Sequence, residues 1–207
     1  MKPAQPIQLY RHPLSGHSHR VELFLSLLSL PYELCHVELP KGAHKQPEFL
    51  RKNPFGQVPV IADGDVTLAD SNAILIYLAE RYDVDARFWP RSPEGRARVV
   101  RWLSVAAGEL VGGPGAARLI KVFGRPLDYA QAVAMAERLL ALLETELSAR
   151  PFLAAETPTL ADLALYAYVA RAPEGDVSLE PYAAVRAWLA RIERLPGFVP
   201  MATAARS

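Results

Sequence analysis

The spacing of apolar residues changes near residue 83, and this change constrains the fold more than any other feature of the chain. Up to that point, short strand-like segments alternate with helix-like ones, and beyond it no segment has the pattern of a strand. The first pattern is typical of a small α/β unit and the second of packed helices. We therefore expect an α/β domain at residues 1–83, a linker at 84–92 and an all-helical domain at 93–207.

The first part predicts the element order β-α-β-(α)-β-β-α. Its opening helix has Val21, Phe24, Leu25 and Leu28 at the spacing that places one apolar face on a helix. The expected segments are a strand at 7–10, a helix at 18–30, a strand at 35–39, a loop with a short helical turn at 41–56, two strands joined by a turn at 63–64, and a helix at 71–82.

The second part predicts one helix that begins near Glu94 and passes Trp102, followed by helices at 129–148, 160–171 and 182–194. Thr159 and Asp162 have the spacing of a capping box, with aspartate in place of glutamate. The helix that follows them is apolar on nearly all sides, which is typical of a helix at the centre of its domain. The glycine-rich segment 109–126 fits either a bent helix or an interhelical loop.

The composition excludes several classes of protein. The chain has 207 residues, is 51% hydrophobic and has a net charge of +1, so nothing favours a nucleic-acid or membrane partner. It has no apolar leader or membrane-length segment, and we expect a soluble cytoplasmic protein. Its one cysteine, Cys35, excludes an internal disulfide or a Cys-rich metal site, and its place in the pattern predicts a buried thiol.

The stretch RHPLSGHSHRV, residues 11–21, combines histidines with serines and raises the possibility of a metal site or a hydrolase. His17 and His19 stand two apart at a helix start and point in different directions, and no third group is spaced to orient a histidine base. We therefore expect no metal. We expect His12 to have a structural role in its loop, and His17 and His19 to lie at the surface or the rim of a cleft.

Three further features have both a structural and a functional interpretation. Asp70–Ser71 follows a strand and opens a helix, so it either caps that helix or holds a ligand amine and carboxylate. A cis Val58–Pro59 bond would expose main-chain groups to an extended ligand, whereas a trans bond would be an ordinary start of a strand. His44 and Lys45 are either ligand donors or solvated loop charges.

Taken together, these motifs resemble the cytosolic glutathione transferases over essentially the whole chain, most closely the phi-like and related bacterial serine-type members. The resemblance implies a thioredoxin-like first domain and a helical second domain. It places catalysis on Ser15 and the glycine end of glutathione against His44 and Lys45. It assigns main-chain contacts to Gln57, Val58 and a cis Pro59, and the γ-glutamyl end to Asp70 and Ser71. Asp70 stands where glutamate is more usual.

The resemblance also implies an activity. The Ser15 hydroxyl would donate a hydrogen bond to the sulfur of glutathione, a co-substrate rather than a permanent cofactor, and the thiolate would attack a hydrophobic electrophile in a detoxifying homodimer. Ser18 is the alternative donor. By position only, the electrophile pocket would include Leu14, Leu110, Val111, Arg118 and Phe123. The sequence leaves open a peroxidase, disulfide reductase, dehalogenase or isomerase reaction, and a non-catalytic glutathione-binding or regulatory protein.

Overall fold

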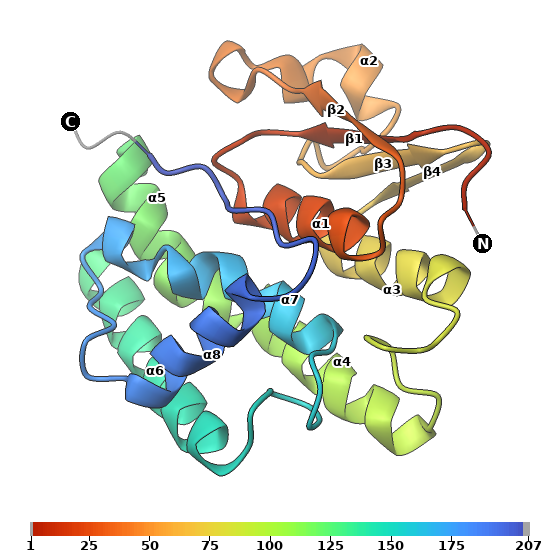
Figure 1. Cartoon of the computed structure of the whole chain (residues 1–207). Coiled ribbons are helices and arrows are strands. Elements are labelled where there is room, and N and C mark those ends of the chain that lie inside the picture. The colour runs from red at the N-terminus through yellow and green to blue at the C-terminus, as the bar shows by residue number, and fades with distance from the viewer. Residues whose placement is uncertain (1, 205–207) are drawn as a thin grey trace. The chain divides into compact units, whose positions relative to one another are not determined.

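The computed structural model describes residues 2–204 and divides them into two compact units (Figure 1). Unit 1 contains the chain up to Ala86 together with Pro196–Ala202, and Arg87–Leu195 form the body of unit 2. The expected boundaries put residues 196–202 in the helical domain, and the structure groups them with unit 1 instead. Long-range hydrogen bonds explain this difference. The Ser26 hydroxyl donates to the Gly197 carbonyl at 2.6 Å, and His19 Nε2 lies 2.8 Å from the Val199 carbonyl.

Unit 1 is a thioredoxin-like α/β unit built on a four-stranded sheet in the order β2-β1-β3-β4. Strands β1 and β2 are parallel, whereas β3 is antiparallel to both β1 and β4. Helices α1 and α3 lie on one face of the sheet and α2 on the other (Figure 1). The elements are β1 (Ile7–Arg11), α1 (Gly16–Leu27), β2 (Tyr32–His36), the 3-10 turns η1 (Leu39–Lys41) and η2 (Ala43–Lys45), α2 (Pro47–Leu50), β3 (Val60–Asp63), β4 (Val66–Ala69) and α3 (Ser71–Tyr82).

The register of the sheet brings three distant segments to one end of it. Val60 pairs with Tyr10 on one side and with Ala69 on the other. Both neighbours are antiparallel to β3, so the residue before Val60, Pro59, lies level with the last residue of β1 and with Asp70. The loop that leads into α1, the Val58–Pro59 bond and the start of α3 therefore meet at the same end of the sheet.

The element order in unit 1 agrees with the expected one, but four local predictions were wrong. The second strand is Tyr32–His36 rather than residues 35–39, because it pairs along the whole of β1 as an edge strand. Cys35 is accordingly only half-buried. The first helix begins at Gly16, two residues early, because Ser15 caps it. The hairpin turn is Gly64–Asp65, since Asp63 already pairs with Val66.

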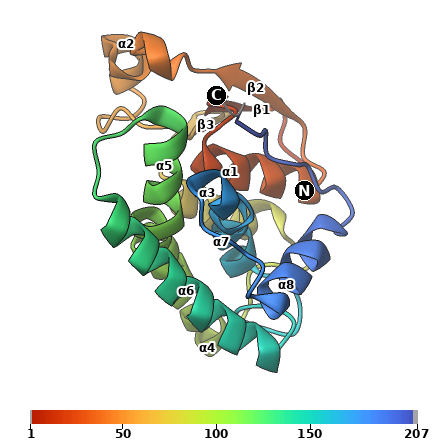
Figure 2. The ribbon, with the colours of Figure 1, turned by 90° about the vertical axis from the view of Figure 1, so that its left-hand side faces the viewer.

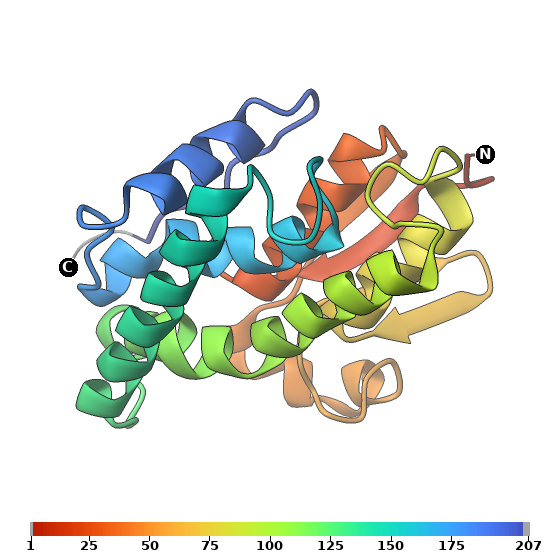
Figure 3. The ribbon, with the colours of Figure 1, turned by 90° about the horizontal axis from the view of Figure 1, so that it is seen from below.

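Unit 2 consists of helices, with α7 lying between α4 and α8 (Figure 3) and α6 visible along its length in Figure 2. The capping box is confirmed, and nearly every residue of α7 is buried. The elements are α4 (Pro93–Ala107), η3 (Val111–Gly115), α5 (Ala116–Phe123), α6 (Tyr129–Ala149), α7 (Leu160–Ala170), η4 (Ala172–Gly175) and α8 (Ala183–Glu193). Within residues 2–204, no helix is long and apolar enough to cross a membrane.

The glycine-rich segment is a turn of π-helix, η3, that continues into α5. A side chain at Gly113 would lie only 2.9 Å from the backbone nitrogen of Ala136, so glycine permits the close approach of η3 to α6. Of the two interpretations that the sequence left open, the structure contains the interrupted helix.

Candidate active site

Ser15 is the N-cap of α1 and, unlike Ser18, is partly exposed. Its Oγ accepts the main-chain N–H of Ser18 at 3.2 Å. A serine hydroxyl has one proton to donate and two lone pairs to accept, so this cap leaves the proton for another acceptor. The side chain is partly exposed at the positive end of the helix dipole, where a ligand anion is stabilised.

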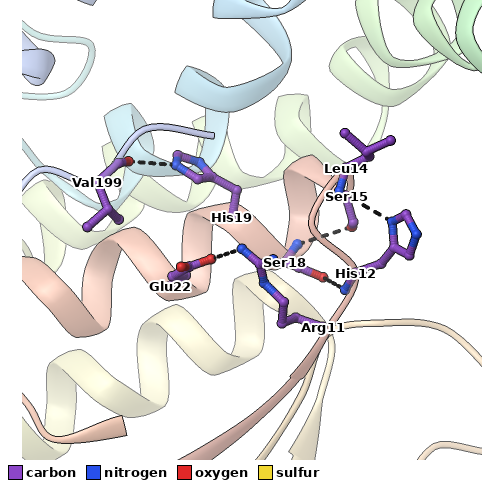
Figure 4. Close-up of polar contacts among 8 residues, drawn as sticks. All are labelled: Arg11, His12, Leu14, Ser15, Ser18, His19, Glu22 and Val199. Carbon is purple, nitrogen blue, oxygen red and sulfur yellow. Dashed lines mark hydrogen bonds and ion pairs between the residues drawn. The ribbon is translucent and has the colours of Figure 1, made fainter. Parts of the chain in front are cut away.

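The alternative hydroxyl, that of Ser18 in the first turn of α1, is fully buried. Its Oγ lies 3.5 Å from the main-chain nitrogen of His12, and the Nδ1 of His12 in turn accepts the N–H of Leu14 at 3.3 Å. His12 thus holds the loop between β1 and α1 in shape, which is the structural role expected for it (Figure 4). Between the two serines, only Ser15 is placed to meet a ligand.

Asp70 is the N-cap of α3 and lies at the same end of the sheet as the loop that leads into α1. Its Oδ1 accepts the main-chain N–H groups of Asn72 and Ala73, both at 2.9 Å. The Asp70 carboxylate is exposed, so a positively charged amine of a ligand could pair with it. Ser71, the first residue of the helix, is only 4% exposed, and its Oγ lies 3.3 Å from the Nδ1 of His17. This contact joins the start of α3 to the first turn of α1, just after Ser15.

His19 does not lie at the surface, so the expectation for it was wrong, whereas His17 is partly exposed. His19 is buried, with its Nε2 against the Val199 carbonyl of the returning segment, and His17 contacts Ser71 at the start of α3. Burial, reinforced by the positive charge of Arg20, lowers the pKa of His17 to about 3. Within residues 2–204 no three His, Cys, Asp or Glu side chains are grouped so as to hold a metal ion.

The lowered pKa of His17 predicts a loss of stability in mild acid. The folded chain keeps His17 neutral, whereas the unfolded chain binds a proton below its ordinary pKa of about 6.5, so stability falls as the pH falls below that value. Between pH 7 and pH 5 the single group should cost about 2 kcal/mol. Urea unfolding at both pH values should show this loss in the wild type and a smaller one in His17→Gln. Parallel losses in the two proteins would contradict the assignment.

The loop before β3 is held by a contact that the sequence did not reveal. Asn53 is buried, donates from Nδ2 to the Gln57 carbonyl at 2.8 Å, and accepts the Phe55 N–H at 3.1 Å. Lys45 donates to the Phe55 carbonyl at 3.1 Å. The only signal for Asn53 was its position before a proline in a loop.

The loop ends in a cis Val58–Pro59 bond, so of the two interpretations left open the structure has the cis one. Gln57 is exposed and Val58 half-buried. His44 is partly exposed next to Lys45, and burial together with the Lys45 charge lowers its pKa. The loop therefore presents main-chain groups and two basic side chains on one continuous segment.

Gly56 is the position in this loop that most needs to be glycine. It has a φ of +58°, and an added Cβ would lie 2.7 Å from the His44 carbonyl oxygen and 2.9 Å from Lys45 Nζ. Gly56→Ala should therefore destabilise unit 1 by about 2 kcal/mol or more. Gly64→Ala is the matched control, because Gly64 has the same φ of +58° with nothing within 4 Å. Equal urea-unfolding losses in the two variants would show that the contact with η2 is unimportant.

The positions suggested for an electrophile pocket have different environments. Leu14 is partly exposed in the Ser15 loop. In unit 2, Val111 is partly exposed and Phe123 is 42% exposed, whereas Leu110 is fully buried. Arg118 is 1% exposed and its Nε donates to Glu174 at 2.7 Å, so this guanidinium is already engaged inside unit 2.

Two family models match the chain. The glutathione S-transferase N-terminal domain matches residues 5–80 and the glutathione S-transferase C-terminal domain matches residues 127–191. Glutathione S-transferase 3 of Zea mays is 36% identical over 93% of this chain and 91% of its own length. Human glutathione S-transferase theta-2 is 35% identical over 92% of this chain and 82% of its own length.

Solved structures give the same result. A glutathione S-transferase from Pseudomonas fluorescens superposes with a TM-score of 0.90 at 33% identity, covering 96% of this chain and 100% of that one. A glutathione transferase homologue from Drosophila mojavensis, solved with bound glutathione, has a TM-score of 0.83 at 28% identity, covering 92% of this chain and 89% of that one.

A thioredoxin-like unit followed by a helical unit is the architecture that these glutathione-dependent enzymes share. The chain belongs to the glutathione S-transferase family.

Proposed function

We propose that the chain transfers glutathione to a hydrophobic electrophile and that the Ser15 hydroxyl stabilises the thiolate that attacks. The observation that carries this proposal is the cap geometry of α1. Ser15 Oγ accepts the Ser18 N–H, which leaves its own proton to donate to a sulfur anion at the helix N-terminus. A free thiol has a pKa of about 8.5, so a hydrogen bond to the thiolate raises the fraction of reactive nucleophile at neutral pH.

The rest of the glutathione site is proposed along the same end of the sheet. The amine of the γ-glutamyl residue would pair with the exposed Asp70 carboxylate. The α-carboxylate of the same γ-glutamyl residue would meet the start of α3 at Ser71. The main chain of Val58, before the cis Pro59, would pair with the cysteinyl part, with Gln57 next to it. His44 and Lys45 would hold the glycine carboxylate. The sheet register and the contact between Lys45 and the Phe55 carbonyl support this arrangement.

Two assays test the proposed function. The purified chain should be retained on immobilised glutathione and released by free glutathione, and it should conjugate an aryl halide faster than the uncatalysed reaction. A panel containing a hydroperoxide, a mixed disulfide and an isothiocyanate would then rank the reactions. Retention without turnover of any of these substrates would favour a binding protein over an enzyme.

A homodimer in the cytoplasm, acting in detoxification, is the biological setting we propose. The names of the relatives support the activity but not the electrophile. Sedimentation of the purified chain measures the oligomeric state directly, and a single species of monomer mass would contradict the proposed dimer.

A further inference from the structure

A buried arginine lies directly behind the start of α3. Arg20, on the second turn of α1, is 1% exposed, and its Nη1 donates to Ser71 Oγ at 3.2 Å and to Asn72 Oδ1 at 2.9 Å. One guanidinium nitrogen thus contacts the first two residues of the helix whose N-terminus carries the proposed γ-glutamyl site.

These contacts determine how the Ser71 hydroxyl can interact. A guanidinium only donates, so Ser71 Oγ must accept from Arg20. The second neighbour of the same oxygen is His17 Nδ1, at 3.3 Å. Burial lowers the pKa of His17 to about 3, so the ring is neutral and has one proton to place on either nitrogen. With that proton on Nδ1, Arg20 and His17 fill both acceptor positions of Ser71, and the hydroxyl proton is left for an anion.

We propose that Arg20 is a positioning residue for glutathione, because its buried guanidinium orients the Ser71 hydroxyl toward the γ-glutamyl carboxylate and adds positive charge behind it. The inference rests on the proposed function, which places that carboxylate at Ser71. Arg20 acts through Ser71 and Asn72. Its contribution is therefore specific to a ligand that carries the carboxylate.

A ligand comparison isolates this contribution. Binding of glutathione is measured beside binding of 4-aminobutanoyl-cysteinylglycine, which keeps the amine and the rest of the tripeptide but lacks the α-carboxylate. Arg20→Met should weaken glutathione binding about tenfold or more, since one tenfold step corresponds to about 1.4 kcal/mol, and should change binding of the analogue less than about twofold. The KM for glutathione should rise accordingly, with the kcat at saturating glutathione largely kept.

If Arg20→Met weakens the binding of both ligands equally, or weakens the binding of neither, the role of Arg20 is overturned. Arg11→Met is the matched control, because Arg11 contacts α1 through an ion pair with Glu22, and this variant should show no preference between the ligands. If Arg20→Met does not fold, Arg20→Lys answers the same question. Lysine keeps the charge without the planar fork, so binding of glutathione should weaken and binding of the analogue should not. Equal weakening of the binding of both ligands again overturns the role of Arg20.

The wild type separates this inference from the function on which it rests. It should bind glutathione more tightly than the analogue. Equal binding of the two ligands by the wild type would mean that no carboxylate is recognised at Ser71, and would overturn both the placement of the γ-glutamyl end and the role of Arg20.

Discussion

Replacing Ser15 by alanine should lower the kcat/KM for conjugation of an aryl halide about tenfold or more, which corresponds to about 1.4 kcal/mol of lost transition-state stabilisation. The reason is that Ser15 Oγ is the partly exposed hydroxyl at the N-terminus of α1, with its proton left to donate once it has accepted the Ser18 N–H at 3.2 Å. Without that donor the thiolate is less populated at neutral pH. Initial rates at pH 6–8 measure the effect.

Alanine removes both the donor and the helix cap, so two further variants separate these roles. Ser15→Thr keeps a hydroxyl and a cap and should keep most of the activity. Ser15→Gly removes the hydroxyl but costs the cap only a few tenths of a kcal/mol, so it should be stable and slow. A glycine variant that is as active as the wild type across pH 6–8 would remove Ser15 from catalysis.

Asp162→Ala should destabilise the chain by about 4 kcal/mol or more, since it leaves several buried donors without an acceptor at about 1–3 kcal/mol each. Asp162 is fully buried. Its Oδ1 accepts the Leu153 N–H and the Trp188 Nε1–H, both at 2.9 Å. Its Oδ2 accepts the Thr159 N–H at 2.8 Å and the Thr159 hydroxyl at 3.1 Å. The carboxylate thus joins the start of α7, the chain before it and α8, and urea unfolding measures its contribution.

Asp128→Ala provides the comparison for this effect. Asp128 is also a helix cap, but it is exposed and accepts one main-chain N–H, that of Gln131, at 3.0 Å. Its loss should cost about 1 kcal/mol, the ordinary value for a cap. Similar losses in the two variants would show that the contacts of Asp162 beyond its own helix contribute little.

Local patterns predicted the fold well where the cause of the structure is itself local. The alternation of strands and helices fixed the order of unit 1, and the spacing of Thr159 and Asp162 predicted the capping box. The helices α6, α7 and α8 begin and end within one or two residues of the expected positions. These helices are marked by local signals, such as the capping box and the continuous apolar run of α7, which depend only on neighbouring residues.

Contacts between distant residues were not predictable in the same way. The contact of His17 with Ser71, at the start of α3 some fifty positions later in the chain, could not be read from local spacing. His19 was misplaced because the segment around Val199 returns to unit 1 and covers it. Segment 109–126 fitted either a loop or a bent helix because glycine disfavours helices, and the close approach of Gly113 to α6 is what requires glycine there.

The pKa of the glutathione thiol bound to the chain tests the central claim most directly. Thiolate absorbance of the complex is followed against pH for the wild type and for Ser15→Gly. In the wild type the pKa of the bound thiol should lie about one unit or more below the value of about 8.5 for a free thiol. In Ser15→Gly this pKa should rise most of the way back to the value of the free thiol. The same lowered pKa in both proteins would contradict the role of Ser15.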